Sequence, residues 1–319
     1  MIIKIVRFGL GVLLVGYFSG CAPKVKISEE PLQPLFTTGD FVVLEQSPIQ
    51  ITQGDYDNGF ASFHPSGNRI LFVSQKGGNA QIYEKDLDTG EEHQIVEFSG
   101  ESESPFWTPD GAGIVFCGYS SQSGDEFQRD IYFYDPNEQL VVPIVEGEGD
   151  DWWAKPADEV RFLYLKDDKG ESSKPFWERN YGIYWGYLDG RASDPIPAEI
   201  APLVSPLISP EGKIIATDRS GSLIWVDPAT GVYEQMLSLA PHKVIDFDLH
   251  PNGNWVLFVS RERETYTLNI FDLSKRILQM LMTSSTPIRS PQFSPSGDKF
   301  LFSREIDGYY QVFLWRMAQ

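Results

Sequence analysis

The sequence predicts an all-β protein, a six-bladed β-propeller of four-stranded blades that is closed by an N-terminal strand. Three observations predict it: a turn motif that recurs along the chain, the apolar strands around each copy, and the layout of the two chain ends. The motif has the form Pro-x-Gly, with Pro65, Pro109, Pro210, Pro251 and Pro295 as its prolines and a degenerate sixth copy at Pro156. The steps of 41 to 54 residues between these prolines are typical of propeller blades rather than of shorter helical repeats.

Each motif lies between two strands in the same order. In the first blade we expect a short strand A at 61–64, a turn at 65–67 and a buried strand B at 70–73. Strand C at 81–85 and strand D at 92–96 complete the blade. The cycle returns along the chain, and no segment has the periodicity of an amphipathic helix.

The chain ends decide how the ring closes. The last blade has strands A, B and C, but the chain stops at Gln319 with no room for strand D. An apolar stretch at 41–52 has no blade of its own, and as strand D of the last blade it would remove both exposed sheet edges. We therefore expect residues 41–319 to form one closed propeller without a second domain.

The first 21 residues have the layout of an export signal. Lys4 and Arg7 are basic, 8–18 is apolar, and Ser19 and Gly20 are small residues before Cys21. This segment resembles a bacterial lipoprotein signal. The alternative is an uncleaved transmembrane anchor, but the apolar run is shorter than the roughly 20 residues that a spanning helix needs.

This resemblance implies a tethered protein. Residues 1–20 are the expected signal peptide, Cys21 is the expected site of lipidation, palmitate included, and 21–40 is a flexible spacer rich in proline. Ala22 after the cysteine implies the outer membrane, by resemblance to enterobacterial sorting.

The charge of the chain excludes some partners. It has 26 basic and 45 acidic residues, a net charge of −19 at neutral pH, and loss of Lys4 and Arg7 makes it −21. Such a charge disfavours nucleic acid and anionic lipid headgroups, so the lipid alone should hold the protein at a membrane. Only Cys21 and Cys117 occur, so no intramolecular disulfide is possible after lipidation. Cys117 lies in an apolar strand, which predicts a buried small hydrophobe.

Two copies of the repeat carry a more specific pattern. Residues 105–111 read Pro-Phe-Trp-Thr-Pro-Asp-Gly and 291–297 read Pro-Gln-Phe-Ser-Pro-Ser-Gly, each before an apolar strand. The pattern resembles the WD-like propeller repeat of TolB proteins and covers most of residues 51–317. The resemblance implies a cell-envelope location in the periplasm and a protein partner. TolB proteins also carry an α/β domain before the propeller, for which the spacer is too short.

No catalytic or metal site stands out. His64 and His250 occupy the repeat position of Thr108, which predicts turn residues rather than metal ligands. The run at 86–90 is similar to a calcium loop but lacks the distal glutamate, so we interpret it as an Asp/Gly turn. No Gly-x-Ser-x-Gly elbow appears. We expect no catalytic residue, no metal and no cofactor.

Propeller topology places the D–A and B–C connections on one face and the A–B and C–D turns on the other. The A–B turns here are uniform, whereas the B–C connections at 118–130 and 166–181 are long. Function is therefore expected on the variable face. The third blade adds 146–153, rich in acids and tryptophan, and Phe176 with Trp177.

The candidate binding residues surround the expected channel mouth. Five residues before each repeat proline stand Phe60, Ser104, Asp151, Ser205, Asp246 and Ser290, mostly small or acidic. With their neighbours they give the candidates Asp57, Glu103, Asp150, Asp151, Trp152, Trp177, Asp246 and Arg289. Two other interpretations stay open. Channel mouths are polar because water fills them, and Trp152, at the repeat position of Pro105, can pack against a neighbouring blade.

The leading hypothesis is a lipid-anchored, TolB-like, monomeric and non-catalytic propeller that binds a protein or peptide partner, at the outer membrane facing the periplasm. The alternative is a carbohydrate-binding or carbohydrate-active propeller, whose acidic residues would act on sugars stacked on tryptophan. A third hypothesis is an assembly scaffold that uses its outer strands.

Overall fold

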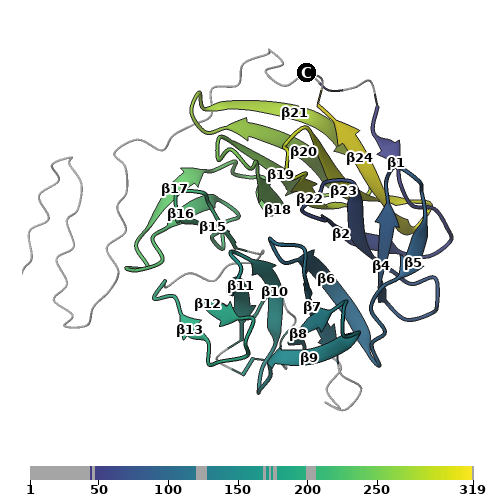
Figure 1. Ribbon diagram of the computed structural model, residues 1–319. Helices are drawn as coiled ribbons and strands as arrows, with labels where there is room; N and C mark the ends of the chain where they lie inside the picture. The colour runs from purple at the N-terminus through teal and green to yellow at the C-terminus, as the bar shows by residue number, and fades with distance from the viewer. Residues whose placement is uncertain are drawn as a thin grey trace, which may run out of the picture.

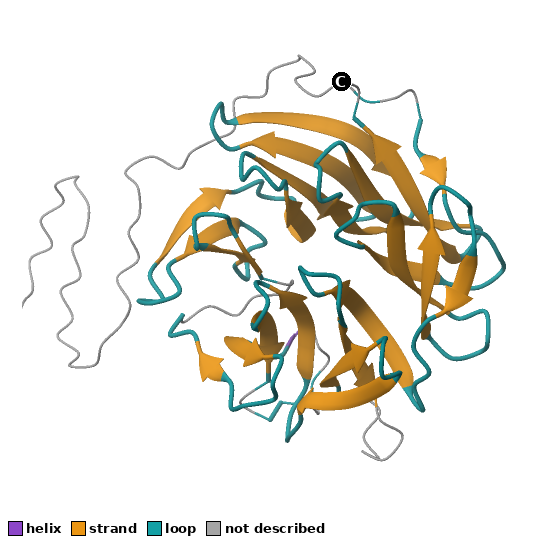
Figure 2. Ribbon diagram, viewed as in Figure 1, coloured by secondary structure: helices purple, strands orange, loops and turns teal. Residues whose placement is uncertain are grey.

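Six four-stranded antiparallel sheets form a ring, which confirms the predicted six-bladed propeller (Figure 1). The computed structural model describes residue 44 and residues 47–119, 128–167, 170–171, 174, 178–198 and 206–317. Strands account for nearly all the regular structure of this part of the chain, which has no α-helix (Figure 2). No described segment is a helix long and apolar enough to cross a membrane.

Strands A to D follow each other from the centre of the ring outwards. The first blade contains β2 (Asn58–Phe63), β3 (Arg69–Ser74), β4 (Gln81–Asp86) and β5 (Glu92–Gln94). The second contains β6 (Glu101–Trp107), β7 (Ile114–Tyr119), β8 (Asp130–Asp135) and β9 (Leu140–Val145). The third contains β10 (Asp151–Pro156), β11 (Arg161–Lys166), β12 (Gly182–Tyr187) and β13 (Asp194–Pro195).

The other three blades follow in the same order. The fourth contains β14 (Leu207–Ile208), β15 (Ile214–Thr217), β16 (Leu223–Val226) and β17 (Tyr233–Leu237). The fifth contains β18 (Lys243–Leu249), β19 (Trp255–Glu262), β20 (Thr265–Asp272) and β21 (Ile277–Ser284). The sixth contains β22 (Ile288–Phe293), β23 (Lys299–Ile306), β24 (Tyr309–Arg316) and, as its strand D, β1 (Ile49–Gln50).

The N-terminal strand closes the ring, as predicted. β1 pairs antiparallel with β24, with Ile49 opposite Leu314 (Figure 1). Beyond β1, Ile51 donates its N–H to the carbonyl of Val312 at 2.8 Å. The buried Thr52 hydroxyl accepts the Val312 N–H at 2.9 Å and donates to Gln311 Oε1 at 3.0 Å. Both ends of the described chain are therefore held in one sheet.

The Pro-x-Gly motif forms the A–B turn in five blades. In each of these turns the glycine donates its N–H to the carbonyl of the residue before the proline, as Gly111 does to Thr108 at 2.8 Å. The glycines have φ between 72° and 80°, the left-handed region that L side chains rarely adopt. This backbone requirement explains why the motif recurs.

The third blade corrects the sequence interpretation. Pro156 lies inside β10 opposite Phe162, as Trp107 lies opposite Ile114 in the second blade. The turn of this blade is therefore 157–160, two residues later than expected, and Asp158 takes the place of the repeat proline. Its carboxylate accepts the N–H groups of Val160 and Arg161, so hydrogen bonds replace the rigid proline ring.

This shift moves the predicted ring of channel-mouth residues. A β-bulge interrupts strand A, and its residue in the left-handed region is Phe60, Ser104, Trp153 and Ser290 in the first, second, third and sixth blades. Trp153, rather than Asp151, thus occupies the position of Ser104. The position of Pro105 belongs to Ala154, not to Trp152.

Apolar strands B form the centre of each interface between blades. Phe72, Phe116, Phe258 and Phe302 are fully buried there. Cys117 is also fully buried, and desolvation raises the pKa of its thiol to about 12. The prediction that Cys117 is an inert small hydrophobe is therefore confirmed.

His64, His250 and the Asp/Gly run at 86–90 make contacts within the blades and between them. His64 contacts Trp107 of the second blade edge-on, with ring centroids 4.8 Å apart. His250 makes the corresponding contact with Phe293 of the sixth blade, at 4.9 Å. Asp86 accepts the N–H groups of Asp88 and Thr89 at 2.9 and 2.8 Å, so the run is a C–D turn, as we interpreted it.

Candidate functional site

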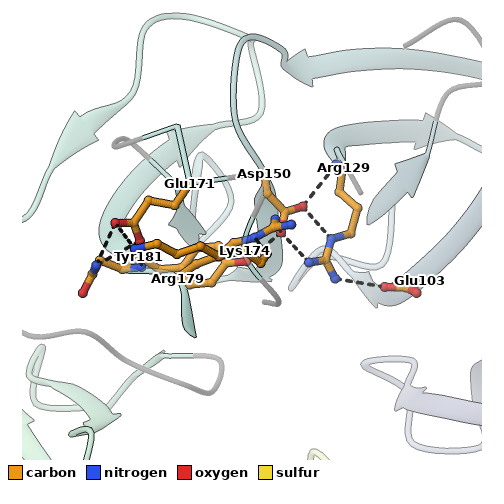
Figure 3. A network of polar contacts seen from close by, with 8 residues as sticks. Glu103, Arg129, Asp150, Glu171, Lys174, Arg179 and Tyr181 are labelled. Carbon is orange, nitrogen blue, oxygen red and sulfur yellow. Dashed lines mark hydrogen bonds and ion pairs between the residues drawn. The ribbon is translucent and has the colours of Figure 1, made fainter. Parts of the chain in front are cut away.

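One buried carboxylate binds the C-terminal ends of both long B–C connections. Asp150, in the connection before β10, has no exposed surface. It accepts hydrogen bonds from Arg129 Nε at 2.7 Å, from Arg179 Nη1 at 2.9 Å and from the Tyr181 hydroxyl at 2.7 Å (Figure 3). Arg129 ends the B–C connection of the second blade, and Arg179 and Tyr181 end that of the third. A single side chain therefore fixes where both connections rejoin the sheets.

Arg129 is the second centre of this network. Its guanidinium lies 3.6 Å from the centroid of the Trp152 ring, which itself stacks on Trp153 at 4.0 Å. It also contacts Glu103 at 3.4 Å. Desolvation lowers the pKa of Arg129, but the hydrogen-bonded Asp150 carboxylate outweighs it, and the net effect is a raised pKa. Arg129 is therefore a buried permanent cation, compensated by charge and by an aromatic ring.

The end of the third blade's B–C connection is further fixed by Glu171. Its carboxylate accepts hydrogen bonds from Lys174 Nζ at 2.8 Å and from the N–H of Asn180 at 2.9 Å. These hydrogen bonds, that of Lys174 above all, lower the pKa of Glu171 to about 2. Lys174 in turn supplies the carbonyl that accepts Arg179 Nε at 2.8 Å (Figure 3). The described part of this connection is thus ordered by polar contacts rather than by an apolar core.

Four of the predicted binding residues lie in this sector of the second and third blades. They are Glu103, Asp150, Asp151 and Trp152. The expectation that Asp151 is an exposed residue of the channel mouth is wrong, because it is fully buried and pairs with Lys166 at 3.1 Å. Trp152 is buried too and packs between Arg129 and Trp153, which agrees with its packing interpretation.

Three other candidates lie where the fifth, sixth and first blades meet. Asp246 accepts the N–H groups of Phe247 at 2.9 Å and Ser290 at 2.7 Å, so it links the fifth blade to the bulge of the sixth. Burial raises the pKa of Asp246 to about 6. Arg289 is exposed, with its guanidinium 5.2 Å from the Tyr310 ring. Asp57 accepts the N–H of Tyr310 at 2.8 Å.

These two groups differ in what they leave open to a partner. Arg289 is exposed, and Asp57 and Asp246 are partly exposed, whereas in the first group only Glu103 is partly exposed and Asp150, Asp151 and Trp152 are buried. The remaining candidates, Trp177 and the lipidation site Cys21, lie outside the described residues, as does Ser205.

Sequence reasoning missed an ion pair across the centre of the ring. Lys155 Nζ lies 2.5 Å from Asp248 Oδ1, although the two residues belong to the third and fifth blades. The other carboxylate oxygen of Asp248 accepts the N–H of Phe293 in the sixth blade at 2.9 Å. Both residues are the second-last residue of a strand A, where the surrounding residues are mostly apolar. A charged residue at this position was the one feature of the sequence that could have indicated the ion pair.

Arg129 and Arg179 were missed for a related reason. Each stands just before a strand C, in a chain whose net charge of −19 drew attention to its acids. The sequence places a basic residue at the end of each long connection, and this could have indicated that both arginines pair with one acid between them, Asp150. Among the described residues, no group of three or more His, Cys, Asp or Glu side chains is placed to hold a metal ion.

Comparison with known proteins identifies the class. No protein-family model matches the chain. One segment of 54 residues is 35% identical to the "Protein TolB homolog" of Chlorobium chlorochromatii (strain CaD3), covering 17% of this chain and 12% of that protein. The structure of TolB from Acinetobacter baumannii superposes with a TM-score of 0.64 at 21% identity, over 77% of this chain and 59% of that one.

An enzyme shares the fold as well. Oligogalacturonate lyase in complex with manganese superposes with a TM-score of 0.58 at 13% identity, over 87% of this chain and 97% of that chain. At these low identities, the superpositions establish the fold alone. The chain is a six-bladed β-propeller similar in fold to TolB, and it spans less than two thirds of the length of the Acinetobacter TolB that it matches.

Proposed function

We propose that this chain is a lipid-anchored protein of the bacterial cell envelope that binds a protein or peptide partner through the face of its D–A and B–C connections. The observation that carries the proposal is the Asp150 network. It anchors the C-terminal ends of the two long B–C connections, on one face, to buried charges. Binding surfaces are frequently built from variable connections that a rigid scaffold positions.

The TolB-like fold supports the same proposal. The chain is similar to proteins named TolB, and export with a lipid on Cys21 would place the propeller at the outer membrane facing the periplasm. The partner is then another envelope protein or an extended segment of one. Its docking residues are proposed to include Arg289, Asp57 and Asp246, which keep exposed surface on this face.

Replacing Arg289 with Ala tests the docking surface. We expect at least a tenfold loss of partner capture from envelope extracts, because an exposed guanidinium is a frequent interface anchor. The melting temperature should hardly change, since exposed side chains contribute within about 0.5 kcal/mol to folding. The measurement is affinity capture of the lipidated protein with mass spectrometry of what is retained, beside a thermal melt.

Asp88→Ala is the matched control. Asp88 is exposed in a C–D turn on the opposite face, and it should leave capture unchanged. Loss of capture from Asp88→Ala with full capture by Arg289→Ala would place the partner on the other face and refute the proposal.

Replacing Cys21 with Ser tests the anchor. The protein should leave the membrane, because its net charge of −19 gives it no attraction to anionic lipid headgroups. It should also stay folded. Metabolic labelling with a fatty-acid analogue and membrane sedimentation after a salt wash are the measurements. Absence of label on the wild type, or sedimentation of the Ser variant with membranes, would contradict lipid anchoring.

A carbohydrate-binding or carbohydrate-active propeller is the second candidate function. The superposition with oligogalacturonate lyase over most of both chains favours it. Incubation with oligogalacturonates, followed by ultraviolet detection of unsaturated products and by calorimetry, separates the two proposals. Turnover or binding by the wild type would support the carbohydrate function.

A further inference from the structure

A second group of buried charges lies beside the Asp150 network and differs from it in balance. Asp151, the first residue of β10, is opposite Lys166, the last residue of β11. The two Asp151 oxygens lie 3.1 and 3.3 Å from Lys166 Nζ. Asp130, the first residue of β8, is also buried, with 8% of its surface exposed. Its Oδ1 is fully enclosed and accepts no hydrogen bond from the described residues.

The two carboxyls share too little positive charge. The two arginines of the Asp150 network supply none of it, because Arg129 and Arg179 are already paired with the Asp150 carboxylate. Lys166 pairs with Asp151 and also acts on Asp130 electrostatically. Besides each other, the charged groups that act on the two carboxyls are Asp150 in the connection before β10, Glu146 in the connection after β9, and Lys166 of β11.

A buried charge without a full partner costs so much that the group takes up a proton instead. We infer that Asp130 and Asp151, which the hydrogen bond from the Asp151 N–H to the Arg129 carbonyl at 2.9 Å brings close together, form a buried proton-binding pair next to the connection at 146–149. The inference goes beyond the proposed function and holds whichever ligand the propeller binds.

The direction of each carboxyl's titration agrees with this geometry. Burial raises the pKa of Asp130 to about 6; the nearby Glu146 adds to the rise, and the Gly147 N–H and Lys166 oppose it. Burial also raises the pKa of Asp151 to about 6, with Lys166 opposing and Asp130 adding. Because an unfolded aspartate titrates near 4, the folded chain holds more protons than the unfolded chain between about pH 4 and pH 6. Both groups therefore favour folding most at low pH and lose that contribution as the pH rises through 6.

Proton uptake has a local consequence on the variable face. Protonation removes the repulsion between Asp130 and Glu146, the first residue of the connection at 146–149. The C-terminal end of this connection is tied down by the Asp151 N–H, which donates to the Arg129 carbonyl at 2.9 Å, and by the Asp150 carbonyl, which accepts the Asp167 N–H at 3.0 Å. Mild acid should therefore hold this part of the face more firmly than neutral pH does.

Carbon-13 titration of the aspartate carboxyls in the full-length Cys21→Ser protein tests the pair. Asp130 and Asp151 should titrate with midpoints near 6. Asp130→Asn should lower the midpoint of Asp151 below its wild-type value, because the Asp130 carboxylate no longer repels that of Asp151, although burial still raises the pKa. The matched control is Glu138→Gln, an exposed acid in a C–D turn, which should leave the Asp151 midpoint unchanged.

Urea unfolding supplies an independent measurement. Asp130→Asn should raise the urea midpoint above that of the wild type at pH 7.5 and give no advantage at pH 4.5, since the charge that it removes is absent in acid. A wild-type Asp151 midpoint near 4, or an Asp151 midpoint that Asp130→Asn does not move, would overturn the inference. So would an equal gain in stability from Asp130→Asn at both pH values.

Discussion

Replacing Asp150 with Ala is expected to lower the free energy of unfolding by about 3 to 5 kcal/mol. The substitution leaves the buried guanidinium groups of Arg129 and Arg179 without their carboxylate, and an uncompensated buried charge costs that much. It also leaves the buried Tyr181 hydroxyl without its acceptor. Urea or thermal unfolding of the variant and the wild type, followed by circular dichroism, gives the difference.

A surface variant and a double variant serve as controls. Glu264→Ala removes an ion pair in which the glutamate side chain is 87% exposed, and it should change stability by no more than about 0.5 kcal/mol. Combining Asp150→Ala with Arg179→Ala should cost less than the sum of the single variants, because the second change removes one of the stranded charges. A loss below about 1 kcal/mol for Asp150→Ala would mean that the network does not hold the connections.

The sequence predicted the blades well because each depends on local chemistry. A glycine with positive φ after a proline, followed by an apolar strand, has few structural solutions, and five A–B turns follow it. The third blade departs because Asp158 closes its turn with hydrogen bonds, and Pro156, two residues earlier, imitates the motif from inside a strand. Both cases place a proline near the end of strand A, and only the glycine two residues after the proline in the five regular copies separates them.

The candidate site was harder to predict because its contacts join distant parts of the chain. An aspartate with acidic neighbours in the sequence, such as Asp150 or Asp151, is expected to be exposed until its basic partner is known. The partners Arg129 and Arg179 lie 21 and 29 residues away from Asp150 in other connections. Lys155 and Asp248 are 93 residues apart and meet only when the ring closes. Sequence pattern therefore located the sector and its charged residues, but not which of them are buried.

Deleting residues 22–52 is expected to abolish cooperative folding, whereas deleting 22–36 should leave the melting temperature unchanged. The longer deletion removes β1 and Thr52, so the apolar strand β24, with Val312 fully buried, becomes an unpaired sheet edge that is prone to aggregate. Size-exclusion chromatography and thermal melts of both truncations, in the Cys21→Ser background, are the measurements. Thr52→Val tests the same joint without a deletion: it keeps the shape but leaves the Val312 N–H and Gln311 without the hydroxyl, at a cost of about 1 to 3 kcal/mol. Equal stability of the two truncations would show that the ring closes without its N-terminal strand.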